Sequence, residues 1–318
     1  MSEVSVVILN WNKSDMTIDL VNNFLNTEKA DVVLVVVDNG SGPGERERLI
    51  KFCKEKGWTI LNEHEISKYV PKSKGYLILL NKNYGYAKGN NYGLRFSKML
   101  GYRYAVISNN DVILEEPVIE ELVEKIKSLN NVAVIGPKIL DQKGREQGPF
   151  TKPTILREFF YPLLYPLFYL FARLSRAVRK LRKQDNQVTY PYRLSGCFML
   201  VDLNVLEKVG YFDENTFLYA EEPILAEKLK SIGYRMAYYP KVYVRHLHGV
   251  STIEFGDKRR YFMQLEADLY YYKKYRGYNK FQLLLVKLGR NYSFYVLRPL
   301  IRTAKSLLRG TVSLTRPK

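Results

Sequence analysis

The chain has 318 residues, of which 46% are hydrophobic, and a formal net charge of +18 at pH 7. This length and apolar content support a sizeable core, organised as one large α/β domain with appended segments or as two domains. The two cysteines, Cys53 and Cys197, fit no metal-binding spacing and exclude a disulfide framework, so we expect both to be small buried hydrophobes.

The positive charge is concentrated in the second half of the chain. Residues 1–150 hold 20 basic and 19 acidic side chains, whereas residues 151–318 hold 30 and 13. Such asymmetry indicates a polyanionic partner, either nucleic acid or an anionic membrane surface. The first residues lack the basic region and apolar stretch of a signal peptide, which predicts a cytoplasmic protein.

Short apolar runs rich in β-branched residues alternate with helical patterns in the first half. The runs are continuously apolar, which is typical of strands buried on both faces of a sheet. Helical patterns follow a cap predicted at Ser14 and a helix start at Pro117. This alternation predicts an α/β fold with a mostly parallel central sheet flanked by helices. The predicted strands are residues 4–9, 32–37, 76–80, 104–108 and 132–135.

Residues 148–191 have a different composition, rich first in proline and aromatic residues and then in basic ones. Residues 159–172 form an uncharged run of 14, short of the roughly 20 residues that a spanning helix needs. Six basic side chains follow between Arg173 and Lys183, an arrangement suited to anionic headgroups. We therefore expect this segment to lie on a membrane. The alternative is that it packs under a loop of the same domain.

An α/β pattern returns at residues 194–202, followed by predicted helices near residues 203–209 and 224–232, each closed by a glycine. Beyond residue 268 there are twelve basic and no acidic side chains. On a helical wheel the basic residues near the C-terminus form one stripe and the apolar residues another. This predicts a basic amphipathic tail over residues 276–318, which either contacts the membrane or packs on its own domain.

Two of the predicted strands run directly into an acidic residue. Residues 32–37 end at Asp38, and residues 104–107 lead into Ser108, Asn109, Asn110 and Asp111. In an open α/β sheet, ligands bind in the crevice outside the carboxyl ends of the strands. Amide and carboxylate oxygens suit a hard cation that bridges a diphosphate, so the second acid predicts a metal-dependent ligand site.

Five local patterns occur in a fixed order along the chain. They are VVILNWN, VVVDNGS, NKNYGYAKGNNYG, SNNDV and the block from Gly196 to Ser251. In this order and spacing the chain resembles a family-two glycosyltransferase of the GT-A fold, nearest to the rhamnosyltransferase-like members. The resemblance implies a GT-A domain at 1–275, followed by the tail at 276–318. Within that domain it implies a nucleotide-sugar-binding half at 1–147, the aromatic and basic insertion at 148–191 and an acceptor half at 192–275.

The resemblance implies that the first patterns hold the sugar nucleotide. Asn10, Trp11 and Asn12 offer an aromatic face and amide groups to a nucleobase. Asp38 can accept a hydrogen bond from a uracil-type imide, and the glycine-rich turn lets backbone approach a ribose or diphosphate. Alternatively, Trp11 belongs to the core, Asp38 caps a turn and the glycines form only a turn. The remaining expected donor-site residues are Asn83, Gly85, Asn91 and Asn110.

In the family, the position of Asp111 holds a divalent metal, Mg²⁺ or Mn²⁺, which bridges this acid and the two phosphates. Asn109 replaces the first acid of the usual Asp-x-Asp, which lowers the negative charge of the site. His246 begins a match to the family's His-x-x-Gly-x-Ser, which implies a metal or diphosphate contact. The alternatives are a turn or helix-cap role for Asp111 and a structural role for His246.

Glu222 is the implied general base, at a position where the family usually has the shorter Asp. An inverting transfer requires a carboxylate near the acceptor hydroxyl, and Glu221 is the nearest competitor for this role. Ile224 replaces the family's second acid, and Pro223 fits the first turn of a helix. The alternatives are a degenerate site that binds sugar nucleotide without turnover and a solvated acid pair at a helix start.

These implications together describe an inverting, metal-dependent hexosyl- or deoxyhexosyltransferase that uses a UDP- or dTDP-type sugar donor. The expected acceptor is a lipid-linked glycan in cell-surface polysaccharide or glycan assembly, and the expected location is peripheral, on the inner face of the cell membrane. One alternative is a sugar nucleotidyltransferase, disfavoured because residues 10–14 replace its glycine-rich, lysine-bearing loop. The other is a non-catalytic membrane- or nucleic-acid-binding protein, which leaves the five ordered patterns unexplained.

Overall fold

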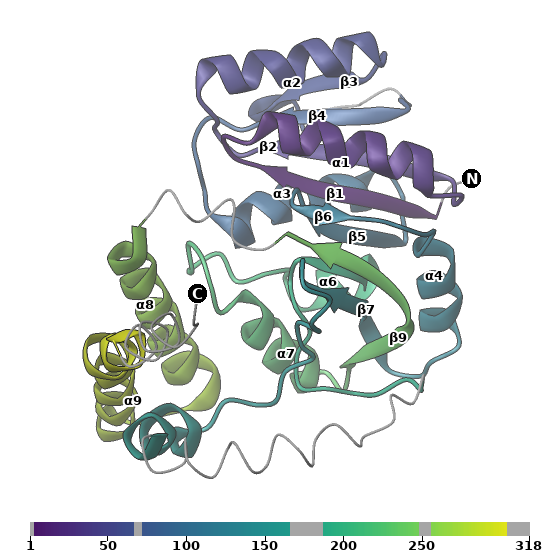
Figure 1. Ribbon diagram of the computed structural model, residues 1–318. Coiled ribbons are helices and arrows are strands. Elements are labelled where there is room, and N and C mark those ends of the chain that lie inside the picture. Colours follow the sequence, from purple (N-terminus) through teal and green to yellow (C-terminus); the bar gives the residue numbers. More distant parts are fainter. Residues whose placement is uncertain (1–2, 67–71, 166–186, 248–255, 304–318) are drawn as a thin grey trace, which may run out of the picture. The chain divides into compact units, whose positions relative to one another are not determined.

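The computed structural model describes residues 3–66, 72–165, 187–247 and 256–303 (Figure 1). The chain divides into two compact units. The first unit comprises residues 1–152 and 186–263, and the second unit comprises residues 153–185 and 264–318. Every predicted site residue belongs to the first unit. Most of the predicted insertion at 148–191 and the whole of the predicted tail at 276–318 belong to the second unit.

A mixed β-sheet forms the centre of the first unit. In the described part of the chain its strands are β1 (Val4–Asn10), β2 (Val32–Asp38), β3 (Thr59–Asn62), β4 (Gly75–Leu79), β5 (Tyr104–Asn109), β6 (Val112–Ile113), β7 (Val132–Leu140), β8 (Phe198–Asp202) and β9 (Arg235–His246). They are ordered β3-β4-β2-β1-β5-β8-β7-β9-β6. The first five strands in this order, β3, β4, β2, β1 and β5, are parallel to their neighbours, and β7 is parallel to β9. Strand β8 is antiparallel to both β5 and β7, and β6 is antiparallel to β9. The predicted mostly parallel sheet is confirmed.

Helices cover both faces of this sheet, because successive strand residues point to opposite sides. Val6 and Ile8 of β1 lie in one core with α1, α2 and α4, whereas Val7 lies in the other core with α3, α6 and α7. Cys53 lies in the first core, where burial raises the pKa of its thiol to about 12. The helices are α1 (Ser14–Thr27), α2 (Pro43–Glu55), α3 (Tyr86–Met99), α4 (Ile119–Lys127), α6 (Leu203–Lys208) and α7 (Glu221–Ser231), with a 3₁₀ turn at Glu63–Glu65.

The predicted cap at Ser14 is wrong. Lys13 occupies the N-cap position of α1 without a side-chain cap, and Ser14 is the first helical residue. Its backbone N–H donates to the Glu45 carboxylate at 2.8 Å, and its hydroxyl donates to the Glu45 carbonyl at 2.7 Å. The acceptor at this helix end therefore comes from α2, which no local pattern around Ser14 indicates.

The strand registers bring the predicted site residues to one edge of the sheet. Asn10, the last residue of β1, pairs with Asp38 at the end of β2. Leu9 pairs with Asn109 at the end of β5. Because these strands are parallel, their carboxyl ends lie side by side, and the loops that follow them surround one crevice.

The second unit contains helical segments from two distant parts of the chain. Residues 155–165 are helical, with a π-helical turn at Leu156–Phe160. They pack against α9 (Lys280–Tyr292), which continues through a π-helical turn at Ser293–Leu297 to residue 303. The third segment is the part of α8 (Gly256–Arg276) that begins at residue 264. Among the described residues, no helix combines the length and the apolar character needed to cross a bilayer.

Parts of three predictions lie outside the described residues. These parts are residues 166–172 of the uncharged run with the basic residues that follow it, residues 304–318 of the tail, and residues 248–251 of the histidine motif. Residues 156–160, which include the first two residues of the uncharged run, pack on α9, and residues 161–165 continue the helix.

A close approach and an ion-pair cluster hold the second unit together. A Cβ atom placed on Gly289 would lie 2.3 Å from the backbone oxygen of Glu158, so only glycine permits this packing. The Arg290 guanidinium lies 2.7 Å from the Glu158 carboxylate and 2.6 Å from the Asp268 carboxylate. Arg290 thus joins residues 155–165, α8 and α9 at one point.

Replacing Arg290 by Met is expected to loosen the second unit. The change removes the cation that Glu158 and Asp268 share, and breaking a largely buried ion pair of this kind costs about 3 kcal/mol. Local opening of α9 should become about 100-fold more frequent, which hydrogen exchange of its backbone amides measures. Lys287→Met removes an exposed charge from the same helix and should leave exchange unchanged. Equal exchange rates in the two variants would show that the Arg290 ion pairs do not hold the second unit together.

Candidate functional site

A cavity of about 300 Å³ lies at the carboxyl edge of the sheet in the first unit. This volume is at the lower end of the range of small-molecule sites. Among the residues predicted for the site, those that line the cavity are Trp11, Asn83, Gly85, Asn110, Asp111, Glu221, Glu222 and His246. Those outside its lining are Asn10, Asn12, Asp38 and Asn91.

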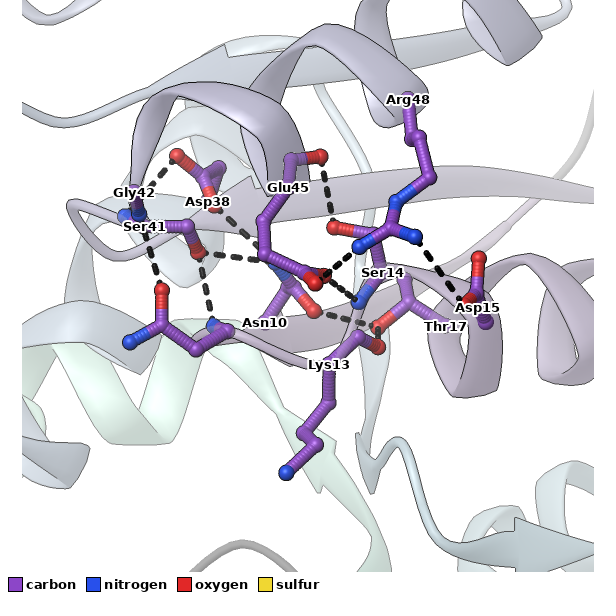
Figure 2. A network of polar contacts seen from close by, with 11 residues as sticks. Asn10, Lys13, Ser14, Asp15, Thr17, Asp38, Ser41, Gly42, Glu45 and Arg48 are labelled. Atoms are coloured by element: carbon purple, nitrogen blue, oxygen red, sulfur yellow. Dashed lines mark hydrogen bonds and ion pairs between the residues drawn. The ribbon is translucent and has the colours of Figure 1, made fainter.

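Asn10 and Asp38 are fully buried and hydrogen-bonded to protein groups. The Asn10 side-chain NH₂ donates to Asp38 Oδ1 at 3.0 Å and to Ser41 Oγ at 3.1 Å (Figure 2). Asp38 Oδ2 lies 3.0 Å from Nε of Arg46, which completes its surroundings. In this arrangement Asp38 fixes the turn after β2, in agreement with the alternative turn role.

The same network continues to the second acid-tipped strand. The Thr17 hydroxyl of α1 donates to Asn10 Oδ1 at 2.8 Å, and the Asn110 side chain donates to the Thr17 oxygen at 3.1 Å. A chain of side-chain hydrogen bonds therefore runs from Asp38 to Asn110, next to Asp111. Thr17 was not predicted, because its only sequence signal is a polar residue on the otherwise apolar face of a helix.

Asn39 organises the donor loop, residues 80–85 between β4 and α3, and was not singled out in the sequence. Its NH₂ group donates to Asn83 Oδ1 at 3.0 Å and to the Gly85 carbonyl at 3.1 Å, and its oxygen accepts from the Tyr84 N–H at 3.0 Å. Asn91 has a related role farther along α3, where its side chain bonds both backbone groups of Phe212 at 3.0 Å. Buried asparagines thus set the loop that borders the cavity.

The donor loop is joined to the segment that precedes the acid pair. The Tyr86 N–H donates to the Phe217 carbonyl at 2.8 Å. Gly85 has φ 84° and ψ −179°, a region open essentially to glycine alone. Tyr219 and Ala220 follow with φ 73° and 64°, two consecutive left-handed residues that are not glycine. Strain concentrates here, directly before Glu221.

Glu222 is held at the cavity by groups from two other segments. Its Oε1 accepts from the Gly196 N–H at 3.1 Å, and its Oε2 lies 3.6 Å from the Arg193 guanidinium. Arg193 is itself stacked on the Phe150 ring at 4.2 Å. A Cβ on Gly196 would lie 3.1 Å from the Glu222 oxygen, so glycine leaves room for the longer carboxylate. Glu221, the alternative base, lines the same cavity but is buried.

Tyr86 closes the cavity beside this acid pair. Its hydroxyl donates to the Gly196 carbonyl at 2.6 Å. The two backbone polar groups of Gly196 therefore bind Tyr86 and Glu222, because the Gly196 N–H donates to Glu222. Burial, together with the nearby charges of Glu221 and Glu222, raises the pKa of Tyr86 well above its ordinary value. The phenol therefore stays neutral and acts as a hydrogen-bond donor.

Asp111 and His246 also line the cavity and lie in contact with each other. His246 Nε2 is 3.0 Å from Asp111 Oδ1, and its Nδ1 is 2.8 Å from the Gln147 side-chain oxygen. Burial lowers the pKa of His246, but the contacts with Asp111 and Cys197 outweigh it and raise the pKa to about 10. Cys197 is buried, as predicted, and it also lines the cavity.

These two side chains fit a cation that binds together with a diphosphate. Among the described residues, no cluster of three or more His, Cys, Asp and Glu could hold a metal by itself. One carboxylate and one imidazole, with Asp111 3% exposed, would supply only part of the shell of such a cation, and phosphate oxygens and water would have to complete it. A cation that engages both side chains must displace the imidazole proton.

Comparison with known proteins gives two curated relatives with partial coverage. The chain is 25% identical over 225 residues to the low-salt glycan biosynthesis hexosyltransferase Agl10 of Haloferax volcanii, a match covering 70% of this chain and 60% of that protein. It is 27% identical over 150 residues to the N-acetylglucosaminyl-diphospho-decaprenol L-rhamnosyltransferase of Mycobacterium tuberculosis, covering 47% of this chain and 48% of that protein. The chain thus matches about half the length of these relatives.

Two solved structures share the fold. GalNAc-T7 with UDP, GalNAc and Mn²⁺ aligns with a TM-score of 0.57 at 12% identity, over 94% of this chain and 57% of that one. The mannosyltransferase PcManGT of Pyrobaculum calidifontis with GDP-Man and Mn²⁺ aligns with a TM-score of 0.54 at 15% identity, over 96% and 80%. The predicted GT-A fold is confirmed. Residues 5–201 match the glycosyl transferase family 2 profile, so the chain belongs to glycosyl transferase family 2.

Proposed function

We propose that the protein is an inverting glycosyltransferase that moves a sugar from a nucleoside-diphosphate sugar to a hydroxyl of a lipid-linked glycan. One observation carries this proposal: a single cavity joins Trp11 and Asp111 from the donor half with Glu222 and His246 from the acceptor half. Family membership supplies the reaction class. The same family membership disfavours a sugar nucleotidyltransferase.

Glu222 would act as the general base. Its carboxylate faces the cavity and is held by the Gly196 N–H and by Arg193, so its position is set before the acceptor arrives. It would take the proton of the acceptor hydroxyl as that oxygen attacks the anomeric carbon. The attacking oxygen forms the new glycosidic bond on the face opposite the departing nucleoside diphosphate, which keeps the electron pair of the broken bond. One displacement of this kind inverts the anomeric configuration.

The donor would lie between the two acid-tipped strands. Trp11 offers its ring to the nucleobase, whereas Asn10, Asn12 and Asp38 shape the turn that presents it, since their side chains bond to neighbouring protein groups. The donor loop would border the ribose and diphosphate. For Asp38 we therefore propose a positioning role in place of the predicted direct contact with the base.

A divalent cation, Mg²⁺ or Mn²⁺, would be held by Asp111 and His246 together with the donor's phosphates. When bound, the cation offsets the charge that develops on the leaving diphosphate. Both structural neighbours contain Mn²⁺ and a nucleotide or nucleotide sugar. Because two protein ligands alone hold a cation weakly, we expect metal and nucleotide to bind cooperatively.

A lipid-linked acceptor and an anionic membrane surface agree with the charge of the second half of the chain, 30 basic against 13 acidic residues. The mycobacterial relative is named for a decaprenol-linked diphosphate acceptor. In line with the charge of the chain, we propose that the protein acts as a peripheral protein at the cytoplasmic face of a membrane, in the assembly of a cell-surface glycan.

The direct test incubates the protein with Mn²⁺ or Mg²⁺ and a panel of UDP-, dTDP- and GDP-sugars. Release of nucleoside diphosphate should require the cation, one class of donor and a lipid-linked acceptor such as polyprenyl-diphosphate N-acetylglucosamine. Asp111→Asn should abolish cation-dependent donor binding in calorimetry, whereas Asp141→Asn, outside the cavity lining, should leave it unchanged. Cation-dependent donor binding without release under any acceptor would instead establish the degenerate, binding-only site.

A further inference from the structure

The second unit exposes many large apolar side chains. Within its described residues, Leu156 is 70% exposed, Phe281 66% and Leu300 58%. Such exposure is unusual in a packed helical unit. Where exposed apolar side chains gather on a protein surface, they mark an interaction site. The other large apolar side chains that this unit exposes are Phe160, Tyr161, Leu163, Leu164, Leu284, Leu288, Tyr295 and Val296.

These side chains form stripes on two helices that pack together. Phe281, Leu284, Leu288 and Tyr295 recur at intervals of three, four and seven residues, which places them on one face of α9 and its continuation. Residues 156, 160 and 163 recur at intervals of four and three on the partner segment. The two segments meet where Gly289 approaches the backbone of Glu158 and Phe159, so each stripe includes a residue that is next in sequence to this crossing, Leu288 on α9 and Phe160 on the partner segment.

The surroundings of the stripes are strongly basic. The exposed basic side chains in the described part of the second unit are Arg157, Lys273, Lys274, Lys280, Lys287, Arg298 and Arg302. The acidic side chains in the same part are Glu158, Glu266 and Asp268, and two of them are engaged by Arg290. The exposed surface of this unit therefore combines apolar stripes with an excess of positive charge.

We propose that the paired stripes of residues 156–164 and 281–300 are a docking surface for an anionic lipid bilayer. Aromatic and leucine side chains on one helix face, flanked by lysine and arginine, are the composition of helices that lie in the membrane interface. The basic flanks attract anionic headgroups, and the apolar stripes enter the boundary of the acyl chains. The inference extends the proposed function, which requires a lipid-linked acceptor, and names the surface that brings the enzyme to it.

Charge complementarity favours a bilayer over a second copy of the chain. Two copies that paired through this surface would bring their basic flanks together, and like charges oppose such an interface. A bilayer with anionic lipid offers opposite charge to the flanks and an apolar layer to the stripes at once. Salt should weaken this attraction, because it acts mainly between exposed charges.

The test is flotation of the full chain with phosphatidylcholine vesicles and with vesicles that also contain phosphatidylglycerol, at about 0.15 M and about 1 M salt. Wild type should float with the anionic vesicles at low salt. The triple variant Phe281→Ser, Leu284→Ser, Leu288→Ser should bind at least about tenfold more weakly. The control variant Leu25→Ser, Met99→Ser changes two similarly exposed apolar residues of the first unit and should float like wild type.

Circular dichroism and donor binding, measured on the same samples, separate the possible failures. Equal flotation of the triple variant and wild type would overturn the surface assignment, as would wild type that floats with neither kind of vesicle. A dimer in sedimentation that only the triple variant loses, without flotation, would reassign the surface to contact between copies. Intact donor binding in a variant that no longer floats supports the inference, and lost donor binding in a wild type that floats would count against the proposed function alone.

Discussion

Glu222→Gln should lower the rate of sugar transfer by about 10²- to 10⁴-fold, the usual contribution of a positioned general base. Glutamine keeps the length of the side chain and an oxygen that can accept from the Gly196 N–H, so the loop stays in place. It loses the charge that faces Arg193 and the ability to take a proton. Single-turnover transfer measures the rate, and calorimetry with nucleotide sugar should show donor affinity within about twofold of wild type, because the base contacts the acceptor.

Two companion variants distinguish this role from a structural one. Glu222→Asp restores the usual residue of the family but withdraws the carboxylate from the Gly196 N–H, so its rate should lie between those of wild type and Glu222→Gln. Glu221→Gln changes the buried neighbour and should reduce the rate less. If Glu221→Gln lowers the rate of sugar transfer more than Glu222→Gln does, Glu221 and not Glu222 is the general base.

Gly85→Ala should lower donor affinity by about 10- to 100-fold, before steric overlap is counted. Alanine in the φ 84°, ψ −179° region costs about 1–3 kcal/mol, and each 1.36 kcal/mol is tenfold in binding. In addition, its Cβ atom would lie 2.1 Å from the Phe217 carbonyl oxygen, so the donor loop and the segment before Glu221 must separate. The expected loss is therefore at the larger end of this range, and it should affect donor binding and transfer together.

Gly210→Ala is the matched control for this prediction. Gly210 also has positive φ, 71°, but an added Cβ atom would meet nothing within 4 Å. Gly210→Ala adds only the conformational strain, and Gly210 is outside the cavity lining, so thermal stability should fall slightly while donor affinity stays at the wild-type value. Donor affinity that is equal in Gly85→Ala and Gly210→Ala would show that the contact between the two loops has no part in binding.

Several features of this protein could be predicted from the sequence because their causes are local. Continuous apolar runs predict buried strands, and the runs at 32–37 and 104–108 became β2 and β5. Because parallel strands end at one edge, an acid that directly follows a strand is placed near the ligand crevice without further information. The placement of Asp111 in the cavity therefore agrees with the sequence, as does that of Trp11.

Other features depend on partners that are distant in the chain. The acceptor at the start of α1 comes from Glu45, and the group that holds Glu222 comes from Gly196 and Arg193. Asn39 was part of a quoted pattern, yet its link to the donor loop needs the register of β2 beside β4. In strand β9 the residues 236–240 are buried in succession, and burial alternates with partial exposure only from Lys241 to His246.

By itself, the sequence determined the fold class, the family and that one acid ends β2 while another lies just after β5. Only the tertiary structure decided that these acids differ in kind. Asp38 is enclosed by Asn10, Ser41 and Arg46, whereas Asp111 faces a cavity with His246. It also decided that the aromatic segment and the basic C-terminal helices form one unit, since Gly289 and Arg290 join stretches more than 100 residues apart in the sequence. The physical reason is the same in both cases. Periodicity along a chain fixes which face of an element is buried, but it does not fix which distant residue packs against that face or pairs with its polar groups.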